Sequence, residues 1–270
     1  MKTLQLFSLL ILGSFLSFGQ SAIPKRLKIN SMSFSLGMIA DVYQKMDLNS
    51  MRDLSTNPEI FNHNLDGYEE NLWRESGGLM IKLDANFSLY DPINQTYALN
   101  KEVRLGIGLS AREPLISYDK NERAPDGSYT YNESIVYCNM QNEINVSGAF
   151  LWKTGGNKKR IFRAYAGLGS NVGATINDRM VVMWNSYETT RDPVSGEYES
   201  ENTEYEFTDI KAKSALFLRA YAPLGMELNL WRIKLGVESN LGLGVHQTLG
   251  GQTHFLPFSF NMLMRAGYNF

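Results

Sequence analysis

An alternating strand ends the chain. Along residues 259–270, apolar side chains occupy every second position from Phe260 to Phe270, and polar or small side chains lie between them, with Leu263 as the exception. A repeat of two residues indicates a β-strand with one apolar and one polar face. Because a bare apolar edge promotes aggregation, we expect this strand to close a barrel by pairing with the first strand.

Seven other segments alternate in the same way, and each has about the ten residues that a tilted membrane strand needs. They cover residues 27–38, 79–89, 102–112, 140–152, 162–172, 210–220 and 231–246. The pattern predicts an all-β fold, an antiparallel up-and-down transmembrane β-barrel of eight strands. A barrel of ten strands would result if 39–76 or 178–205 held a further hairpin in the membrane.

Alternation alone does not distinguish a barrel that faces lipid from a soluble β-sandwich or a lipocalin-like barrel, whose apolar face points inward. The connections favour the membrane barrel, because long and short ones alternate with a single exception at 247–253. The long ones cover 39–76, 113–133 and 178–205, and the short ones cover 91–101, 154–159 and 223–230. Outer-membrane barrels have short periplasmic turns and longer outer loops, so both termini are expected on the periplasmic side.

Aromatic residues mark the end of the expected barrel where the short turns lie. Seven of them fall on the apolar face beside these turns: Phe87, Phe150, Trp152, Phe162, Trp231, Tyr268 and Phe270. Trp and Tyr collect where lipid chains meet water, so the set predicts a periplasmic aromatic girdle. A looser second set is expected near the opposite rim: Trp73, Tyr131, Tyr137, Trp184 and Tyr187.

Residues 1–19 have the pattern of a secretory signal peptide, with a basic start, an apolar run over 4–18 and a small-x-small site ending at Gly19. The run is shorter than the ~20 apolar residues of a membrane-spanning helix, so we expect cleavage and a single β-barrel domain over 20–270. Cys138 is the only cysteine, which excludes an internal disulfide. The net charge of −2 gives no indication of nucleic-acid binding.

With these features, the chain resembles the small eight-stranded bacterial outer-membrane β-barrel proteins, including the outer-membrane β-barrel-domain family common in Bacteroidetes-type bacteria. The resemblance rests on the signal peptide, the eight alternating strands and the final four residues, 267–270. In such proteins, aromatics at the last and third-last positions resemble the signal that the barrel-assembly machinery recognises. The resemblance therefore implies an outer-membrane location in a Gram-negative cell and this assembly role for Tyr268 and Phe270. It implies no particular activity.

Fourteen charged residues fall on the polar face and would point into the barrel. They are Lys82, Asp84, Glu102, Arg104, Arg112, Glu143, Arg163, Lys211, Lys213, Arg219, Arg232, Lys234, Glu238 and Arg265. Eight strands leave an interior just wide enough for side chains, and glycines such as Gly106 and Gly108 on the same face would make room for them. Charges removed from water must pair or incur a large desolvation cost, so we expect a salt-bridged plug. The alternative is a narrow, porin-like channel, which would favour anions because cations predominate.

An enzyme is the second class of function. Some small outer-membrane barrels deacylate lipid A with a His and a Ser two residues apart near the outer rim, and with an acidic partner. The weak counterparts here are His246, Thr248 and Glu238, but Thr replaces Ser, and His246 is expected to point into the lumen rather than toward lipid. We predict no cofactor and no metal site, because His63 and His254 share no spacing with His246.

The long connections are the remaining functional surface. We expect a short helix over 42–54, and Pro/Gly turns at 124–127 and 192–196 predict hairpins that carry strands beyond the membrane. The acidic run over 197–206 has two interpretations: a site for divalent cations that bridge lipopolysaccharide, or a solvated edge kept charged against aggregation. The expected partners are outer-membrane lipid or lipopolysaccharide, the barrel-assembly machinery, and an unnamed protein or surface ligand at these loops. Nucleic acid is not expected.

Overall fold

The computed structural model of the protein describes residues 27–42, 47–71, 75–154, 161–192, 195–249, 251 and 253–270. Side chains are described throughout these ranges except at 71, 75, 76, 177 and 201–207. The expected signal peptide at 1–19 and the rim aromatic Trp73 lie outside the described residues.

The described chain is almost entirely antiparallel sheet. Its strands are β1 (Leu27–Val42), β2 (Glu69–Asn71), β3 (Glu75–Asp91), β4 (Thr96–Arg123), β5 (Tyr129–Lys153), β6 (Phe162–Arg191), β7 (Tyr198–Lys211), β8 (Ala215–Leu230), β9 (Ile233–Thr248) and β10 (Thr253–Asn269). The expected total of eight strands is therefore wrong for the sheet of the described residues, which has ten, although eight of these form the closed ring. The two additional strands, β2 and β7, come from the segments that the sequence assigned to outer loops.

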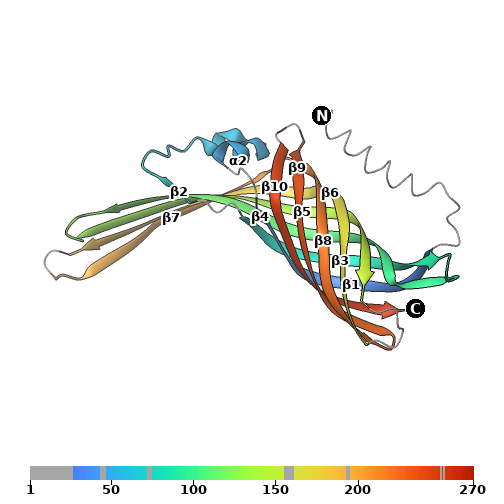
Figure 1. Cartoon of the computed structure of the whole chain (residues 1–270). Coiled ribbons are helices and arrows are strands. Elements are labelled where there is room, and N and C mark those ends of the chain that lie inside the picture. Colours follow the sequence, from blue (N-terminus) through green and yellow to red (C-terminus); the bar gives the residue numbers. More distant parts are fainter. Residues whose placement is uncertain are drawn as a thin grey trace.

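The pairings close into a ring in the order β1, β3, β4, β5, β6, β8, β9, β10 and back to β1. The seam joins the last strand to the first, from the pair Ser31–Asn269 to the pair Val42–Phe258. Strands β2 and β7 stand outside this ring, since β2 pairs with β4 and β7 pairs with β6. The sheet is thus a closed barrel with two appended strands (Figure 1).

Three strands are far longer than a barrel wall requires. Strands β4, β5 and β6 have 28, 25 and 30 residues, against about ten for a tilted membrane strand. Their distal halves, together with β2 and β7, project from one end of the barrel (Figure 1). We call this projection the blade and this end of the barrel the blade end. The opposite end, where the short turns and the C-terminus lie, is the turn end.

The two predicted hairpins form the tips of the blade. Strands β4 and β5 stay paired out to Arg123 and Thr130, and β6 and β7 out to Arg191 and Tyr198. Gly127 and Gly196 have φ angles of 71° and 76°, a left-handed conformation that glycine adopts without steric cost. Both predicted hairpins are therefore present, and they carry their strands past the end of the barrel.

A small lid covers the inner face of the blade. It comprises helix α2 (Leu48–Leu54) and the 3₁₀ turn η2 (Pro58–Phe61). Asp47 caps α2 by accepting a hydrogen bond from the Ser50 backbone N–H at 2.8 Å, which satisfies one of the unpaired donors at a helix start. A helix was expected over 42–54, and the observed one occupies the second half of that range.

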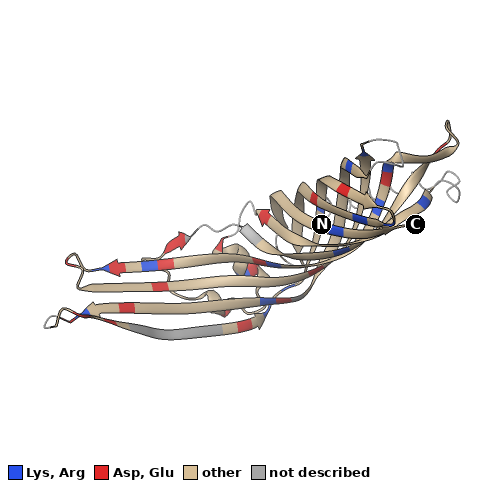
Figure 2. Cartoon of the chain, turned by 90° about the horizontal axis from the view of Figure 1, so that it is seen from below, with Lys and Arg blue, Asp and Glu red and all other residues tan. Residues whose placement is uncertain are grey.

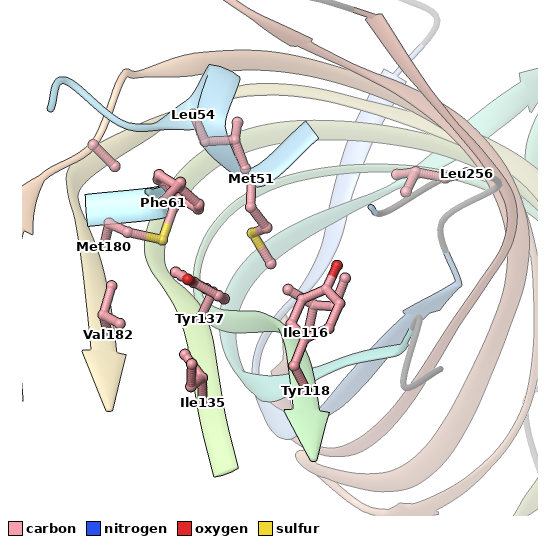
Figure 3. Packing of buried hydrophobic residues seen from close by; sticks show 11 residues of the cluster. Met51, Leu54, Phe61, Ile116, Tyr118, Ile135, Tyr137, Met180, Val182 and Leu256 are labelled. Carbon is pink, nitrogen blue, oxygen red and sulfur yellow. The ribbon is translucent and has the colours of Figure 1, made fainter. Parts of the chain in front are cut away.

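The lid is held by the main apolar cluster of the protein (Figure 3). Its members are Met51, Leu54, Phe61, Ile116, Tyr118, Ile135, Tyr137, Met180, Val182, Ala212 and Leu256, all at most 8 % exposed. Phe61 stacks on Tyr137 with ring centroids 4.8 Å apart. The cluster joins the lid to β4, β5, β6 and β10, so the lid closes the barrel at the blade end.

The barrel wall below the lid has the opposite polarity to that of a soluble protein. Outward residues are apolar and exposed, as at Leu83 (51 %), Val146 (58 %) and Met264 (65 %). Inward residues are charged and buried, as at Arg104 (3 %) and Glu238 (1 %). The faces follow the two-residue alternation of the sequence.

Among the described residues, no helix is both long and apolar enough to cross a membrane.

Candidate functional site: the barrel interior and its lid

Glu238 is the centre of the barrel interior. It lies on β9 and forms ion pairs with Arg104 of β4 and, at 3.1 Å, with Arg265 of β10. The Tyr165 hydroxyl on β6 donates to the same carboxylate at 2.7 Å. Four strands around the ring therefore converge on one carboxylate. This arrangement fills the middle of the lumen and links opposite walls.

Asp84 extends this centre toward β3 and β1. Its carboxylate lies 3.0 Å from the Lys82 ammonium and 2.8 Å from the Arg265 guanidinium. Arg265 also donates to the Ser33 hydroxyl at 2.8 Å. Because Arg265 contacts both Asp84 and Glu238, the two anions share one cation, and the charges are paired within the layer.

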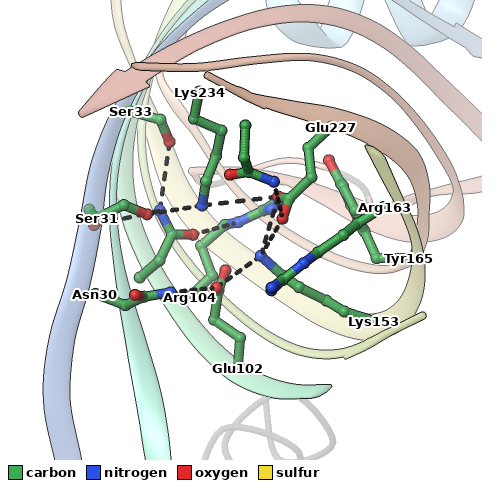
Figure 4. Close-up of polar contacts among 12 residues, drawn as sticks. Asn30, Ser31, Ser33, Glu102, Arg104, Lys153, Arg163, Tyr165, Glu227 and Lys234 are labelled. Atoms are coloured by element: carbon green, nitrogen blue, oxygen red, sulfur yellow. Dashed lines mark hydrogen bonds and ion pairs between the residues drawn. The ribbon is translucent and has the colours of Figure 1, made fainter. Parts of the chain in front are cut away.

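A second layer of charge lies toward the turn end (Figure 4). The Lys153 ammonium is 2.7 Å from Glu102 and 3.0 Å from Glu227. Lys234 contacts Glu227 at 3.6 Å and donates to Ser31 at 2.9 Å. Each buried ammonium in this layer therefore faces a carboxylate, as burial of charge requires.

The third layer lies toward the blade end, beneath the lid. Arg112 pairs with Asp41 and, at 2.8 Å, with Glu143. Arg219 reaches the same two carboxylates, at 3.3 and 3.2 Å. Two guanidiniums and two carboxylates thus form a closed group, and its four side chains are at most 2 % exposed. His246 lies beside this group at 1 % exposure, opposite His254 in the register of β9 and β10.

Of the fourteen charged residues expected to point into the barrel, ten lie in these layers. They are Lys82, Asp84, Glu102, Arg104, Arg112, Glu143, Arg219, Lys234, Glu238 and Arg265. Another, Arg163, is half-buried near the turn end and donates to the Leu99 carbonyl at 3.4 Å.

Three further residues assigned to the lumen lie elsewhere. Lys211 belongs to the blade strand β7 and is exposed, because the chain changes strands at 212–214 and the alternation does not continue from 210 to 220. Lys213 lies in that crossing and donates its backbone N–H to Leu54 of the lid. Arg232 occupies the β8–β9 turn on the outside, where it donates to the Tyr268 hydroxyl at 2.8 Å.

The sequence interpretation missed four members of the network: Asp41, Lys153, Tyr165 and Glu227. Asp41, Lys153 and Glu227 had been placed in connections or at strand ends. Extending the two-residue alternation would have found them, because Glu227 is eight residues from Arg219 and Lys153 is ten from Glu143 on the same strand.

Little empty space remains among these side chains. A cavity bordered by Asn86, Arg104 and Tyr165 has a volume of ≈ 10 Å³, room for at most one water molecule. A Cβ atom at Gly106 would collide with the Asp84 carboxylate, and one at Gly108 would lie 2.8 Å from the Asn145 side-chain oxygen. The glycines thus provide the room that the charged side chains occupy.

The weak catalytic candidates do not form a site. His246, Thr248 and Glu238 are buried at 1 %, 0 % and 1 % exposure and face the interior, away from the apolar wall. Glu238 lies eight residues along β9 from His246, about 26 Å at the usual rise of a strand, and it is bound by Arg104 and Arg265. Nothing at this position could reach a lipid on the outer wall. Among the described residues, no group of three or more His, Cys, Asp or Glu is arranged to hold a metal ion.

The aromatic residues expected at the turn end lie on the outer wall there. Trp152, Phe162, Trp231 and Phe270 are exposed by 48 %, 57 %, 87 % and 67 %. Tyr268 packs edge-on against Phe270, with ring centroids 5.6 Å apart.

The second aromatic set does not form a girdle at the other rim. Tyr137 is fully buried in the lid cluster, and Trp184 packs against that cluster. Tyr131 also lies on the inner face of the blade, and Tyr187 lies on the blade rather than the barrel rim. The prediction was wrong because the strands extend past the rim and carry these residues into the blade.

Glu133 of β5 joins the blade to residues 62–71, the segment that follows the lid. Its carboxylate accepts the Trp184 indole N–H at 2.5 Å and is hydrogen-bonded to Tyr68 and Tyr131. Partial burial raises the pKa of Glu133, but the hydrogen bonds from Tyr68, Trp184 and Tyr131 outweigh burial and hold it below its ordinary value of 4.5. The contact therefore stabilises the segment 62–71 at neutral pH.

We expect the pH dependence of this contact to follow from the lowered pKa. A carboxylate with a lowered folded-state pKa stabilises the fold above its ordinary pKa, and the contribution is lost as the pH falls through the folded-state value. In the Glu133→Ala variant, hydrogen exchange over 62–71 should be several-fold faster at pH 7. The difference should shrink when both proteins are compared near pH 3, after correction for intrinsic exchange rates. A difference that stayed constant with pH would show that the carboxylate charge is not involved.

No family model and no curated protein matches the chain. Among solved structures, the attachment invasion locus protein Ail of Yersinia pestis, in complex with the heparin analogue sucrose octasulfate, is similar at 12 % identity and a TM-score of 0.28. The alignment covers 90 % of this chain and all of that chain. A second structure of Ail, without that ligand in its description, gives 10 % identity and a TM-score of 0.25 over the same coverage. A likeness this low carries no inference about the function of this chain, which has to be inferred from its own geometry.

Proposed function

We propose that the protein is a bacterial outer-membrane β-barrel that anchors the blade and its lid at the cell surface, with a structural or binding role. The apolar outer wall carries this proposal. Soluble monomers rarely expose contiguous apolar patches larger than a few hundred Å². Here every strand of the ring presents apolar residues outward, for example Phe34, Leu105 and Leu235 at 48 %, 46 % and 44 % exposure. Contact between apolar surface and water is unfavourable, and a hydrocarbon environment removes this cost. A closed barrel also has no unpaired edge within the membrane.

The orientation follows the pattern of such barrels, with short turns in the periplasm and long elements outside. Both ends of the barrel domain would then be periplasmic, and the blade would stand on the outer side. Outer-membrane lipid and lipopolysaccharide would contact the wall, with the aromatic girdle at its inner margin. We further propose that Tyr268 and Phe270 serve as the signal for the barrel-assembly machinery, and that residues 1–19 direct export. On the same residues, we propose that the protein is related to the outer-membrane β-barrel-domain family of Bacteroidetes-type bacteria.

A plugged lumen favours anchoring over transport. The three charged layers cross the interior from Lys153 to Arg219, and both signs are paired throughout. A conducting pore needs a continuous water-filled path, whereas the cavity beside Arg104 admits at most one water. Planar-bilayer recordings of the folded protein should therefore give no steady single-channel conductance. Reproducible steps from monomers would contradict the plug.

The membrane location is tested by a charge on the outer wall. Val146 lies midway along the barrel part of β5, so Val146→Lys should lower the free energy of unfolding in lipid vesicles by about 2–4 kcal/mol. In a soluble protein an exposed valine at 58 % tolerates lysine within about 0.5 kcal/mol.

Asn132→Lys provides the matched control, because Asn132 lies on the same strand but on the blade. It should change the folding free energy by no more than about 0.5 kcal/mol. Equal effects of the two lysines, or a soluble native protein without heat-modifiable gel mobility, would reject the membrane location.

A further inference from the structure

We propose that the free edge of β7 binds an extended, Lys/Arg-rich segment of a partner protein by adding it to the blade as a further strand. This inference rests on the proposed function, since it takes the blade to be exposed at the cell surface. It deepens that function by naming the surface and the chemistry of the partner.

The two edges of the blade differ. At the β4 edge, the protein covers part of its own strand, because β2 pairs with residues Ser117, Tyr118 and Asp119 of β4. Within the described part of the chain, β7 has β6 as its only strand neighbour. Its last residue, Lys211, is covered by Thr56, whose hydroxyl and backbone N–H both donate to the Lys211 carbonyl.

The uncovered edge of β7 is long enough to hold a peptide. From Tyr198 to Asp209 it runs for twelve residues, and its register with β6 is continuous apart from one irregularity at Asn185/Ser186. A strand that lacks a neighbour on one side presents a row of backbone N–H and C=O groups, which is the template used in recognition by strand addition. The edge of β4 accepts β2 by this same geometry, so the blade already supports such pairing.

Charge selects the partner. The segments that build the distal blade and the strand beside it, residues 62–71, 115–138 and 181–210, contain fifteen Asp and Glu against three Lys and Arg, a formal charge of −12. The whole chain carries only −2. Acidic residues recur along the projecting strands in Figure 2. The sequence of β7 includes Glu199, Glu201, Glu204 and Glu206. A field of this size attracts a basic segment and raises its association rate.

The same charges disfavour other strands at this edge. A second copy of β7 would bring two glutamate-rich strands side by side, and like charges across a strand pair are destabilising. A glutamate-rich edge also protects against aggregation, and that role alone would leave the edge without a partner. Partner binding and protection against aggregation differ in one result. Only if the edge binds a partner will it pair with a basic strand through backbone hydrogen bonds.

The test uses the full-length protein folded in detergent micelles and a synthetic twelve-residue peptide of alternating Lys and Thr. Hydrogen exchange should slow at least tenfold for backbone amides of β7 between Tyr198 and Asp209 that face away from β6. Amides in β2 and in the barrel should be unchanged. A peptide of the same sequence with N-methyl groups on every backbone amide keeps the charge but cannot pair along either of its edges, so its affinity should fall at least tenfold.

Charge variants separate this edge from the acidic surface as a whole. Replacing Glu199 and Glu201 together by Gln should weaken peptide binding about tenfold. The matched change of Glu69 and Glu70 to Gln, at the covered edge, should alter it less than twofold. Binding that survives N-methylation, or that leaves β7 exchange unchanged, would overturn the proposal by reducing it to non-specific attraction. Absence of binding by a barrel that is folded and heat-modifiable would also overturn it, while leaving the anchor function intact.

Discussion

Replacing Glu238 by alanine is expected to lower the free energy of unfolding by about 3–5 kcal/mol, because it leaves two buried guanidiniums without their shared carboxylate. Arg104 and Arg265 both pair with Glu238, and the Tyr165 hydroxyl would lose its acceptor as well. Removal of one member of a buried ion pair costs more than the pair contributed, since the remaining charge cannot recover its hydration. Urea titration of the protein in lipid vesicles measures the change.

Two further variants define the origin of this loss. Glu238→Gln retains the shape of the side chain but not its charge, so a loss close to that of Glu238→Ala would identify charge rather than a cavity as the cause. Glu122→Ala removes a carboxylate from the exposed blade pair with Lys120, at 2.8 Å, and should cost about 0–1 kcal/mol. A Glu238→Ala protein as stable as Glu122→Ala would mean that water reaches the interior, contrary to the plug.

The lid should be equally sensitive at Phe61. Phe61→Ala removes a ring that is 1 % exposed and stacked on Tyr137 at 4.8 Å, and a buried Phe→Ala change costs about 3–5 kcal/mol. We expect the loss to be local, because the lid packs on the barrel without being part of its ring. Hydrogen exchange of α2 (Leu48–Leu54) should accelerate strongly, whereas exchange in β9 should stay slow.

Ile93 supplies the control for this change. It lies in the β3–β4 turn at 89 % exposure, so Ile93→Ala should leave exchange in α2 unaltered. Unchanged exchange of α2 in Phe61→Ala would show that contacts other than the apolar cluster hold the lid. Loss of heat-modifiable mobility in the same variant would instead show that the lid is needed for the barrel itself.

The barrel wall was well predicted from the sequence because one face of each strand is apolar and points outward, whereas the other points into the charged interior. Residues such as Leu83 and Asp84 differ sharply in polarity, so alternation is visible wherever an apolar surface lies back to back with the charged interior. The same contrast placed ten of the fourteen expected lumen residues in the charged layers, since parity along a strand decides the side on which each lies.

The blade was harder to predict because both of its faces meet water or a small local core. Segment 119–122 reads Asp-Lys-Asn-Glu, which has no apolar face, although it continues β4 without a break. The lid cluster was missed for a related reason. Most of its members come from segments assigned to loops, and only the tertiary fold brings Phe61 against Tyr137. Lys153 and Glu227 were missed because the expected strands were ended too early, beside the short turns.

The order of segments along the chain gives the lid a second consequence. Helix α2 lies between the first two strands of the ring, yet its apolar cluster includes Leu256 of β10, the last strand. The backbone N–H of Lys213, just before β8, also bonds to Leu54 of the lid. These contacts span most of the sequence, so they form late, after the intervening loops have closed. The complete lid cluster therefore requires the last strand to be in place, so the packing of Leu256 links the lid to closure of the ring.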